Sequence, residues 1–161
     1  MSATVKLAQP IHQELTLTRV FDAPRALVYQ MWTDPKHLAE WFGPREFTNS
    51  KVEVDARKGG HIRLVMNSPW GTQHPMDGTF REVVKNEKLV FSNNAVDEAG
   101  GILIQAITTV TFEDAGNGKT KMTLHTDAYG MVDVSAKMLE GMEAGWSQSF
   151  EKLADAIARA K

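Results

Sequence analysis

The stretch Arg19–Pro44 reads RVFDAPRALVYQMWTDPKHLAEWFGP and carries the strongest structural signals in the chain. Asp22 is a candidate helix N-cap. Pro24 suits the first helical turn because proline has no N–H to leave unpaired. These residues predict a first helix that runs to about Trp32, with its apolar side chains facing inward.

The same stretch predicts a second short helix directly after the first. Thr33-Asp34-Pro35 repeats the capping signal. Gly43-Pro44 ends the helix, because glycine relieves the exit turn and proline cannot continue a helix. We expect this strand–helix–helix unit to close the mouth of a curved sheet.

The chain before this unit predicts a strand. Ile11, Leu15, Leu17 and Phe21 share one parity, which indicates a half-buried strand over residues 11–21. Residues 1–10 are expected to form a flexible lead-in. Residues 11–161 are expected to form a single domain, since single domains commonly hold about 100–200 residues.

After the two helices the chain takes on the period of strands. Asn117-Gly118 between two alternating runs is a strong hairpin signal, because that turn needs positive φ at both central residues. The short links favour an antiparallel meander, since parallel strands need longer crossovers. Six runs are predicted as strands: 47–55, 61–66, 74–84, 87–93, 102–113 and 119–127.

The C-terminal part changes period again and predicts one long helix. Its apolar residues recur every three or four positions, so they form a stripe that must be buried against the sheet. The predicted fold class is therefore α+β, with a curved seven-stranded antiparallel sheet wrapped on a long C-terminal helix. The stripe consists of Met138, Met142, Trp146, Phe150, Leu153 and Ile157.

Composition narrows the classes of partner and compartment. The formal net charge of the 161 residues is −2, and no window collects a run of like charges, which argues against nucleic-acid or membrane-surface partners. The chain has no cysteine, so disulfides, thiol nucleophiles and thiolate metal sites are excluded. It also lacks a sustained apolar run at its N-terminus. We expect a cytoplasmic protein that does not span a membrane.

Several short motifs spread over the chain together carry a family resemblance. The motifs are Arg19-Val-Phe-Asp-Ala-Pro24, Trp32-Thr-Asp-Pro35, Trp41-Phe-Gly-Pro44, Gly59-Gly60, Gly78-Thr-Phe80-Arg-Glu82, Leu89-Val-Phe91 and Gly145-Trp146. With them the chain resembles the START-like, or SRPBCC, helix-grip superfamily typified by the birch-pollen allergen. Within it, the chain is most similar to the family named after the C-terminal domain of the activator of Hsp90 ATPase. The resemblance covers roughly residues 12–160 and implies a helix-grip fold whose cavity often holds apolar small molecules in relatives.

The polar residues give no strong catalytic or metal signature. The five histidines form no HExxH or HxH pair, so no metal site and no cofactor are predicted. His61 and His74 lie on neighbouring predicted strands, where they either form a functional pair or serve as ordinary polar side chains. The glycines of GMEAG at 141–145 are expected to let the helix approach the sheet or to leave space for a ligand.

The candidate cavity residues are mainly aromatic residues and methionines. Such side chains usually form core, but flat rings and flexible methionines also adapt to varied ligands. Arg19 shares the inward parity of its strand, so its guanidinium needs either a ligand anion or a structural carboxylate, and we favour the carboxylate. The candidates are Arg19, Trp32, Trp41, Phe42, Met66, Trp70, Met76, Phe91, Tyr129, Met138, Met142 and Trp146.

Three functional hypotheses follow from the sequence and the resemblance. The leading one is a non-enzymatic domain that binds an apolar or lipid-like small molecule between the sheet and the C-terminal helix. The second is a cavity enzyme of the hydrolase, cyclase or isomerase kind, which needs a titratable group in the cavity. The third is a co-chaperone or protein-interaction module, which needs an exposed apolar patch. A weak homodimer and a chaperone partner both stay open.

Overall fold

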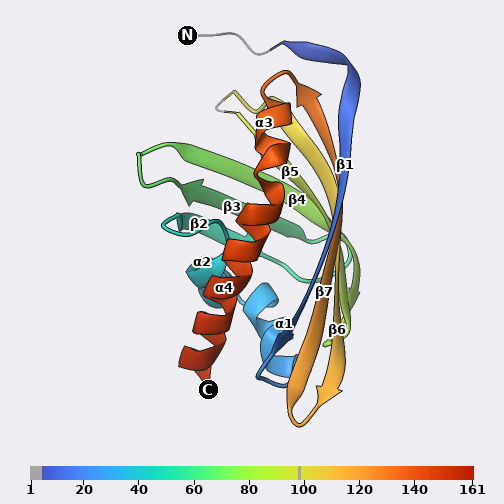
Figure 1. Cartoon of the computed structure of the whole chain (residues 1–161), viewed down its shortest axis with the longest axis vertical. Helices are drawn as coiled ribbons and strands as arrows, with labels where there is room; N and C mark the ends of the chain where they lie inside the picture. Colours follow the sequence, from blue (N-terminus) through green and yellow to red (C-terminus); the bar gives the residue numbers. More distant parts are fainter. Residues whose placement is uncertain (1–4, 98) are drawn as a thin grey trace.

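The computed structural model describes residues 5–97 and 99–161 and confirms the α+β helix-grip architecture (Figure 1). Seven strands form one antiparallel sheet in the order β1-β7-β6-β5-β4-β3-β2. The sheet curves around the C-terminal helices, and two short helices follow the first strand. The elements are β1 (Lys6–Phe21), α1 (Arg25–Thr33), α2 (Pro35–Trp41), β2 (Thr48–Val54), β3 (His61–Asn67), β4 (Gln73–Val84), β5 (Lys88–Val96), β6 (Ile102–Gly116), β7 (Lys119–Val132), α3 (Ser135–Glu140) and α4 (Met142–Ala160).

Strand β1 is longer than the sequence predicted. It begins at Lys6, which pairs with Val132 of β7, and its register shifts before Ile11 pairs with Gly130. The predicted lead-in is therefore wrong for residues 6–10, which form the first part of the strand. Residues 1–4 of that lead-in lie outside the described part of the chain.

One of the two predicted helix caps is confirmed, and the other is wrong. Asp34 caps α2, because its carboxylate accepts a hydrogen bond from the N–H of Lys36 at 2.9 Å. Asp22 does not cap α1. The N-cap position belongs to Pro24, whose carbonyl accepts the N–H groups of Leu27 and Val28. The proline carbonyl thus starts the helix without help from a side chain.

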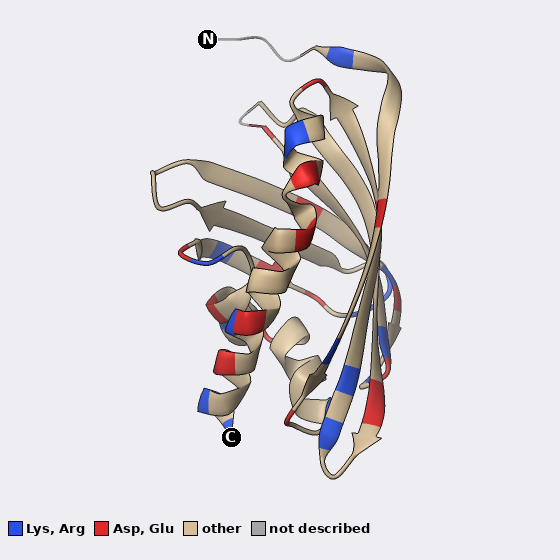
Figure 2. Ribbon diagram, viewed as in Figure 1, with Lys and Arg blue, Asp and Glu red and all other residues tan. Residues whose placement is uncertain are grey.

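The predicted single C-terminal helix is two helices. The helical backbone is interrupted at Gly141, between α3 and α4. Helix α4 crosses the concave side of the sheet, with its charged residues spaced along its length (Figure 2). Its inner side buries Phe150, Leu153 and Ile157, whereas Met138 on α3 is exposed. The apolar stripe is therefore buried in the C-terminal part of α4, half-buried at Met142 and Trp146, and exposed at its α3 end.

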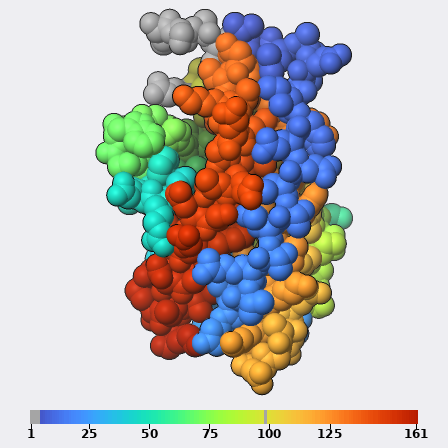
Figure 3. All heavy atoms as spheres, viewed as in Figure 1, coloured from blue at the N-terminus to red at the C-terminus, as the bar shows by residue number. Residues whose placement is uncertain are grey.

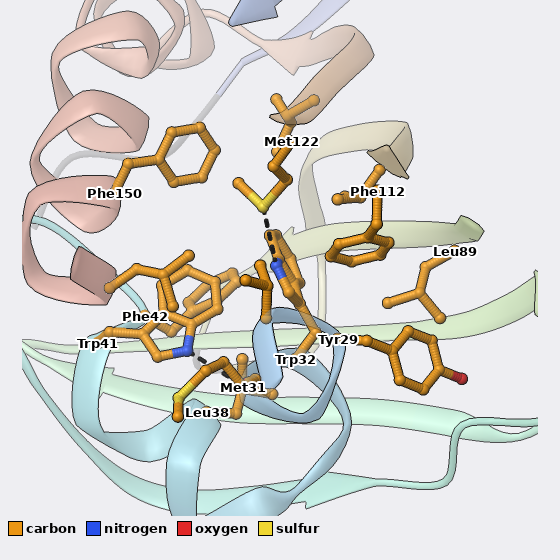
Figure 4. Close-up of a cluster of buried hydrophobic side chains, with 14 of the residues drawn as sticks. Tyr29, Met31, Trp32, Leu38, Trp41, Phe42, Leu89, Phe112, Met122 and Phe150 are labelled. Atoms are coloured by element: carbon orange, nitrogen blue, oxygen red, sulfur yellow. Dashed lines mark hydrogen bonds between the residues drawn. The ribbon is translucent and has the colours of Figure 1, made fainter. Parts of the chain in front are cut away.

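The core lies between the sheet and the helices α1, α2 and α4 (Figure 4). Trp32 and Trp41 are fully buried there, with ring centroids 4.7 Å apart in an edge-to-face arrangement. The indole N–H of Trp32 donates to Met122 Sδ at 3.3 Å, and that of Trp41 donates to the Met31 carbonyl at 3.0 Å. Both polar atoms of this indole pair are thus satisfied inside the core.

Inward-facing residues of the central strands change from large to small along the sheet. At the α1 end, large side chains of β5, β6 and β7 fill the space beneath the helices. Further along the same strands, most of these positions hold small or polar side chains, with Ile104 of β6 as an exception. The core therefore fills only part of the concave face. The large residues are Leu89, Phe91, Val110, Phe112, Met122 and Leu124, and the small or polar ones are Asn93, Ala95, Ala106, Thr126, Ala128 and Gly130.

Candidate ligand pocket

A pocket of about 380 Å³ lies where the small residues leave the concave face unfilled. Helices α3 and α4 pass over this face of the sheet, between β1 and the β2–β4 region (Figure 3). The wall of the pocket is formed by the segment after α2, by strands β3 to β7, and by the two C-terminal helices. The residues of the wall include Phe42, Gly43, Pro44, Phe47, Met66, His74, Met76, Asn93, Ala95, Ile104, Ala106, Thr126, Ala128, Met138, Gly141, Met142, Gly145, Trp146 and Ser149.

Half of the candidate cavity residues chosen from the sequence contribute to this wall. They come from four separate parts of the chain, namely the segment after α2, the β3–β4 hairpin, α3 and α4. Trp146 is half-buried there, and its ring packs edge-to-face on Phe42 at a centroid distance of 5.4 Å. The six residues are Phe42, Met66, Met76, Met138, Met142 and Trp146.

The other aromatic candidates lie elsewhere. Trp32, Trp41 and Phe91 are buried in the core, where neighbouring side chains fill the space around their rings. Trp70 lies in the turn between β3 and β4 and is 70% exposed. Tyr129 is 42% exposed and stacks on His12 at 4.6 Å.

Arg19 is half-buried, as its parity predicted, but it does not line the pocket. Its guanidinium carbon lies 5.5 Å from the ring centroid of Phe21, which is a cation–π contact. Within the described part of the chain no carboxylate forms an ion pair with it, so the favoured structural carboxylate was wrong. The aromatic face of a neighbour on the same strand takes that role.

The segment of residues 43–47 forms one side of the pocket, and its shape depends on glycine. Gly43 has φ of +102°, a conformation that side-chain-bearing residues rarely adopt. A Cβ at this position would also lie 3.0 Å from Met66 Sδ. The N–H of Gly43 donates to Ser149 Oγ at 3.1 Å, which ties the segment to α4.

Lys152 of α4 also holds this segment. Its ammonium donates to the carbonyls of Gly43, Pro44 and Phe47 at 3.3, 3.2 and 3.1 Å. Burial, and in second place the charge of Arg45, lower the pKa of Lys152. Because three residues of the segment meet one ammonium, we infer that Lys152 fixes the position of this pocket wall.

Polar groups lie on the sheet beside the pocket. The hydroxyl of Thr108, which is fully buried, lies 2.8 Å from Asn93 Oδ1 and 2.9 Å from Thr126 Oγ1. Asn93 and Thr126 both line the pocket. The amide N–H2 group of Asn93 forms no hydrogen bond within residues 5–97 and 99–161. The sheet thus offers a hydrogen-bond donor beside an apolar space.

His74 is the second polar feature of the wall. Its Nε2 atom is buried and has no hydrogen-bond partner among the described residues. The ring lies 5.7 Å from that of Phe47. His61 pairs with Thr79 rather than with His74, and it is exposed on the outer face of the sheet. The two histidines therefore do not form the functional pair considered from the sequence.

Gly141, between α3 and α4, and Gly145 of α4 widen the pocket rather than bring the helix close to the sheet. A Cβ on Gly145 would lie 3.7 Å from Pro44 Cγ, and one on Gly141 would lie 3.7 Å from the Met138 carbonyl. These are ordinary contact distances, so neither glycine is required by a close approach. Both residues line the pocket.

The small residues of the sheet were missed because each is unremarkable alone. Ala106 and Ala128 are buried beneath Leu139, and alanine in a strand carries no signal of a pocket. The signal that could have found them is the joint decrease in side-chain size along one parity of β5, β6 and β7.

Comparison with known families now places the chain. The family model of the Activator of Hsp90 ATPase homolog 1-like proteins matches residues 22–158, which is most of the chain. The chain belongs to this family. A search of curated protein sequences gave no match. Among the described helices of this Activator of Hsp90 ATPase homolog 1-like domain, none is long and apolar enough to cross a membrane.

Solved structures of bacterial proteins share the fold of this family member. A protein of Chromobacterium violaceum is 30% identical, with a TM-score of 0.75, over 89% of this chain and 96% of that one. A putative uncharacterised protein of Rhizobium leguminosarum is 24% identical, with a TM-score of 0.77, over 93% and 97%. The AHSA1 protein of Silicibacter pomeroyi is 21% identical, with a TM-score of 0.76, over 92% and 100%.

Proposed function

We propose that this domain binds an apolar small molecule in the pocket between the sheet and the helices α3 and α4. The observation that carries the proposal is the pocket itself, where small residues replace large ones on three adjacent strands. Its volume of about 380 Å³ falls within the range of about 300–1,000 Å³ that is typical of ligand sites. Its wall is mainly apolar, with the four methionines Met66, Met76, Met138 and Met142.

The polar groups of the wall suggest what kind of molecule this is. Such sites usually combine an apolar lining with a few polar groups that orient the ligand. The free amide N–H2 group of Asn93 is positioned to donate a hydrogen bond. The ligand would therefore have an apolar body and one group that accepts hydrogen bonds, such as a carboxylate, carbonyl or hydroxyl.

The wall favours binding over acid–base catalysis. Among the described residues of the wall, His74 is the single titratable side chain, and none is a carboxylate. General acid–base chemistry commonly relies on two groups with different proton affinities. We therefore place the enzyme hypothesis second.

The test uses a variant that obstructs the pocket without weakening the fold. In Gly145→Leu the new side chain starts 3.7 Å from Pro44 and occupies the pocket. Glycine inside a helix costs about 0.8–1.0 kcal/mol relative to alanine, and leucine is close to alanine, so the variant should unfold at a higher temperature. Ala144→Leu is the matched control, because Ala144 is exposed on the same helix and does not line the pocket.

The probes are two derivatives of decane, decanoic acid and decanol. Their binding is measured by native mass spectrometry and calorimetry. We expect wild type and Ala144→Leu to bind the acid or the alcohol equally. We expect Gly145→Leu to bind at least about 10-fold more weakly, which corresponds to 1.4 kcal/mol. Equal binding by Gly145→Leu would place the ligand elsewhere, and a wild type that binds none of the probes would contradict the proposal.

A further inference from the structure

A second group of side chains lies on the outer face of the sheet, away from the pocket. His12 and Glu14 belong to β1, and their parity is opposite to that of the inward-facing residues. Asp127 belongs to β7 and lies directly across the strand pair from Glu14. The register of the two strands thus brings His12 and Glu14 next to Asp127, which is at least 113 residues away from both in the sequence.

The atoms of this group are close to one another. His12 Nε2 lies 3.1 Å from Asp127 Oδ1 and 3.9 Å from Glu14 Oε1. One potential ligand atom from each residue lies within 4.8 Å of both others. A zinc ion binds nitrogen and oxygen at about 2.0–2.2 Å, so its tetrahedral ligands lie about 3.4 Å apart. The two separations measured from His12 Nε2 lie on either side of this value, so small rotations of the exposed side chains would bring the atoms to it.

Neighbouring residues orient two of these side chains. His12 is stacked on the ring of Tyr129, with 18° between the two planes. The other carboxylate oxygen of Asp127 lies 3.4 Å from His125 Nε2, and His125 Nδ1 lies 2.9 Å from Thr16 Oγ1. Outer contacts of this kind hold metal ligands in place and fix the tautomer of a histidine.

The pairing of the two acidic residues also favours a bound cation. Like charges directly opposite each other on antiparallel strands are destabilising. Glu14 and Asp127 are such a pair. A hydrogen bond to His12 is the largest cause of the lowered pKa of Asp127, which favours its carboxylate form. A divalent cation between the two carboxylates would relieve their repulsion.

We propose that His12, Glu14 and Asp127 bind a divalent transition-metal ion of the zinc type on the outer face of β1 and β7. The ligand set of one imidazole and two carboxylates suits zinc and its neighbours, whereas magnesium and calcium prefer oxygen alone. The site lies on the face opposite the pocket and does not depend on the proposed ligand.

The test is a calorimetric titration of the untagged, chelator-treated full chain with Zn²⁺ alone. We expect saturable binding of one ion per chain. Asp127→Asn should weaken binding at least about 10-fold, since even the loss of an outer contact costs 10-fold to 100-fold. His61→Gln is the matched control, because His61 is exposed on β3 outside the cluster, and it should bind like wild type.

Two calorimetric results would overturn the proposal. One is a wild type without saturable binding, and the other is equal binding by Asp127→Asn and His61→Gln. Thermal unfolding of each variant without metal separates a loss of ligands from a loss of fold. Paramagnetic Ni²⁺ gives the location, since it should broaden amide signals of β1 and β7 around residues 12–14 and 125–129. Broadening confined to other strands would also contradict the site.

Discussion

Replacing His74 by leucine should stabilise the protein. His74 Nε2 is buried and lacks a hydrogen-bond partner within the described residues. A buried polar atom left unpaired costs about 1–3 kcal/mol. Leucine removes that atom and keeps an apolar side chain against Phe47. We therefore expect His74→Leu to raise the free energy of unfolding by about 1–2 kcal/mol, or the midpoint temperature by about 2–8 °C.

The assay is urea unfolding followed by circular dichroism, with two histidine controls. His37 on α2 also has a buried ring nitrogen without a partner, Nδ1, but it does not line the pocket. His37→Leu should therefore stabilise the protein as well. His61 is exposed, so His61→Leu should change the free energy of unfolding by less than about 0.5 kcal/mol.

The three leucine variants differ in whether a buried, unpaired ring nitrogen is removed, so their free energies of unfolding test its cost. A loss of stability in His74→Leu, or a gain no larger than that of His61→Leu, would show that the unpaired Nε2 atom of His74 does not destabilise the folded state. If His74→Leu stabilises the protein, a polar group on the pocket wall is kept at the expense of stability. Such exchanges are common at binding sites.

Two further predictions concern Lys152 and Asp127. In Lys152→Met, three backbone carbonyls lose one hydrogen-bond donor. We therefore expect the free energy of unfolding to fall by about 1–3 kcal/mol and hydrogen–deuterium exchange over residues 43–47 to become faster. Unchanged exchange there would contradict the role of Lys152. The pKa of Asp127 is lowered, chiefly by a hydrogen bond to His12. The stability it contributes is therefore present above the ordinary value of 3.8 and is lost as the pH falls through the lower folded value. Chelator-treated Asp127→Asn should lose less free energy of unfolding than wild type during acidification, and parallel losses in urea titrations would rule this out.

Much of the fold could be predicted because local signals agree with the tertiary structure. Asn117 and Gly118 both have positive φ, of 56° and 74°, as the hairpin signal required. The period of two was sufficient to predict the strands, and the capping signal at Asp34 was sufficient to predict the start of α2. The cap at Asp22 was wrong because the carbonyl of Pro24, which no side-chain pattern reveals, starts α1.

The pocket was harder to predict, because periodicity tells which way a side chain faces but not what lies opposite. Trp32 and Trp41 face inward, as predicted, but other large side chains surround them and leave no space. Ala106 and Ala128 also face inward, and there the space stays open. A pocket is the space that side chains leave unfilled. Its position depends on how strands and helices pack against one another, which the sequence of one segment does not show.

The charge cluster on the outer face was missed for a related reason. His12 and Glu14 are two residues apart, and Asp127 lies on the other strand of the pair. Sequence motifs for metals rely on ligands at fixed short spacings. Here the pairing register of β1 and β7 brings the three residues together. That register is a property of the folded sheet, which no short sequence motif reveals.

The methionine methyl groups offer the most direct measurement of ligand binding in the pocket. Met66, Met76, Met138 and Met142 line it, whereas Met31 and Met122 are buried in the core. The chain labelled with ¹³C in its methionine methyls is titrated with decanoic acid and observed by NMR. We expect saturable shifts of the four pocket signals and stationary signals from the two core methionines. Shifts spread equally over both groups, or no shift at the pocket methionines, would contradict ligand binding in the pocket.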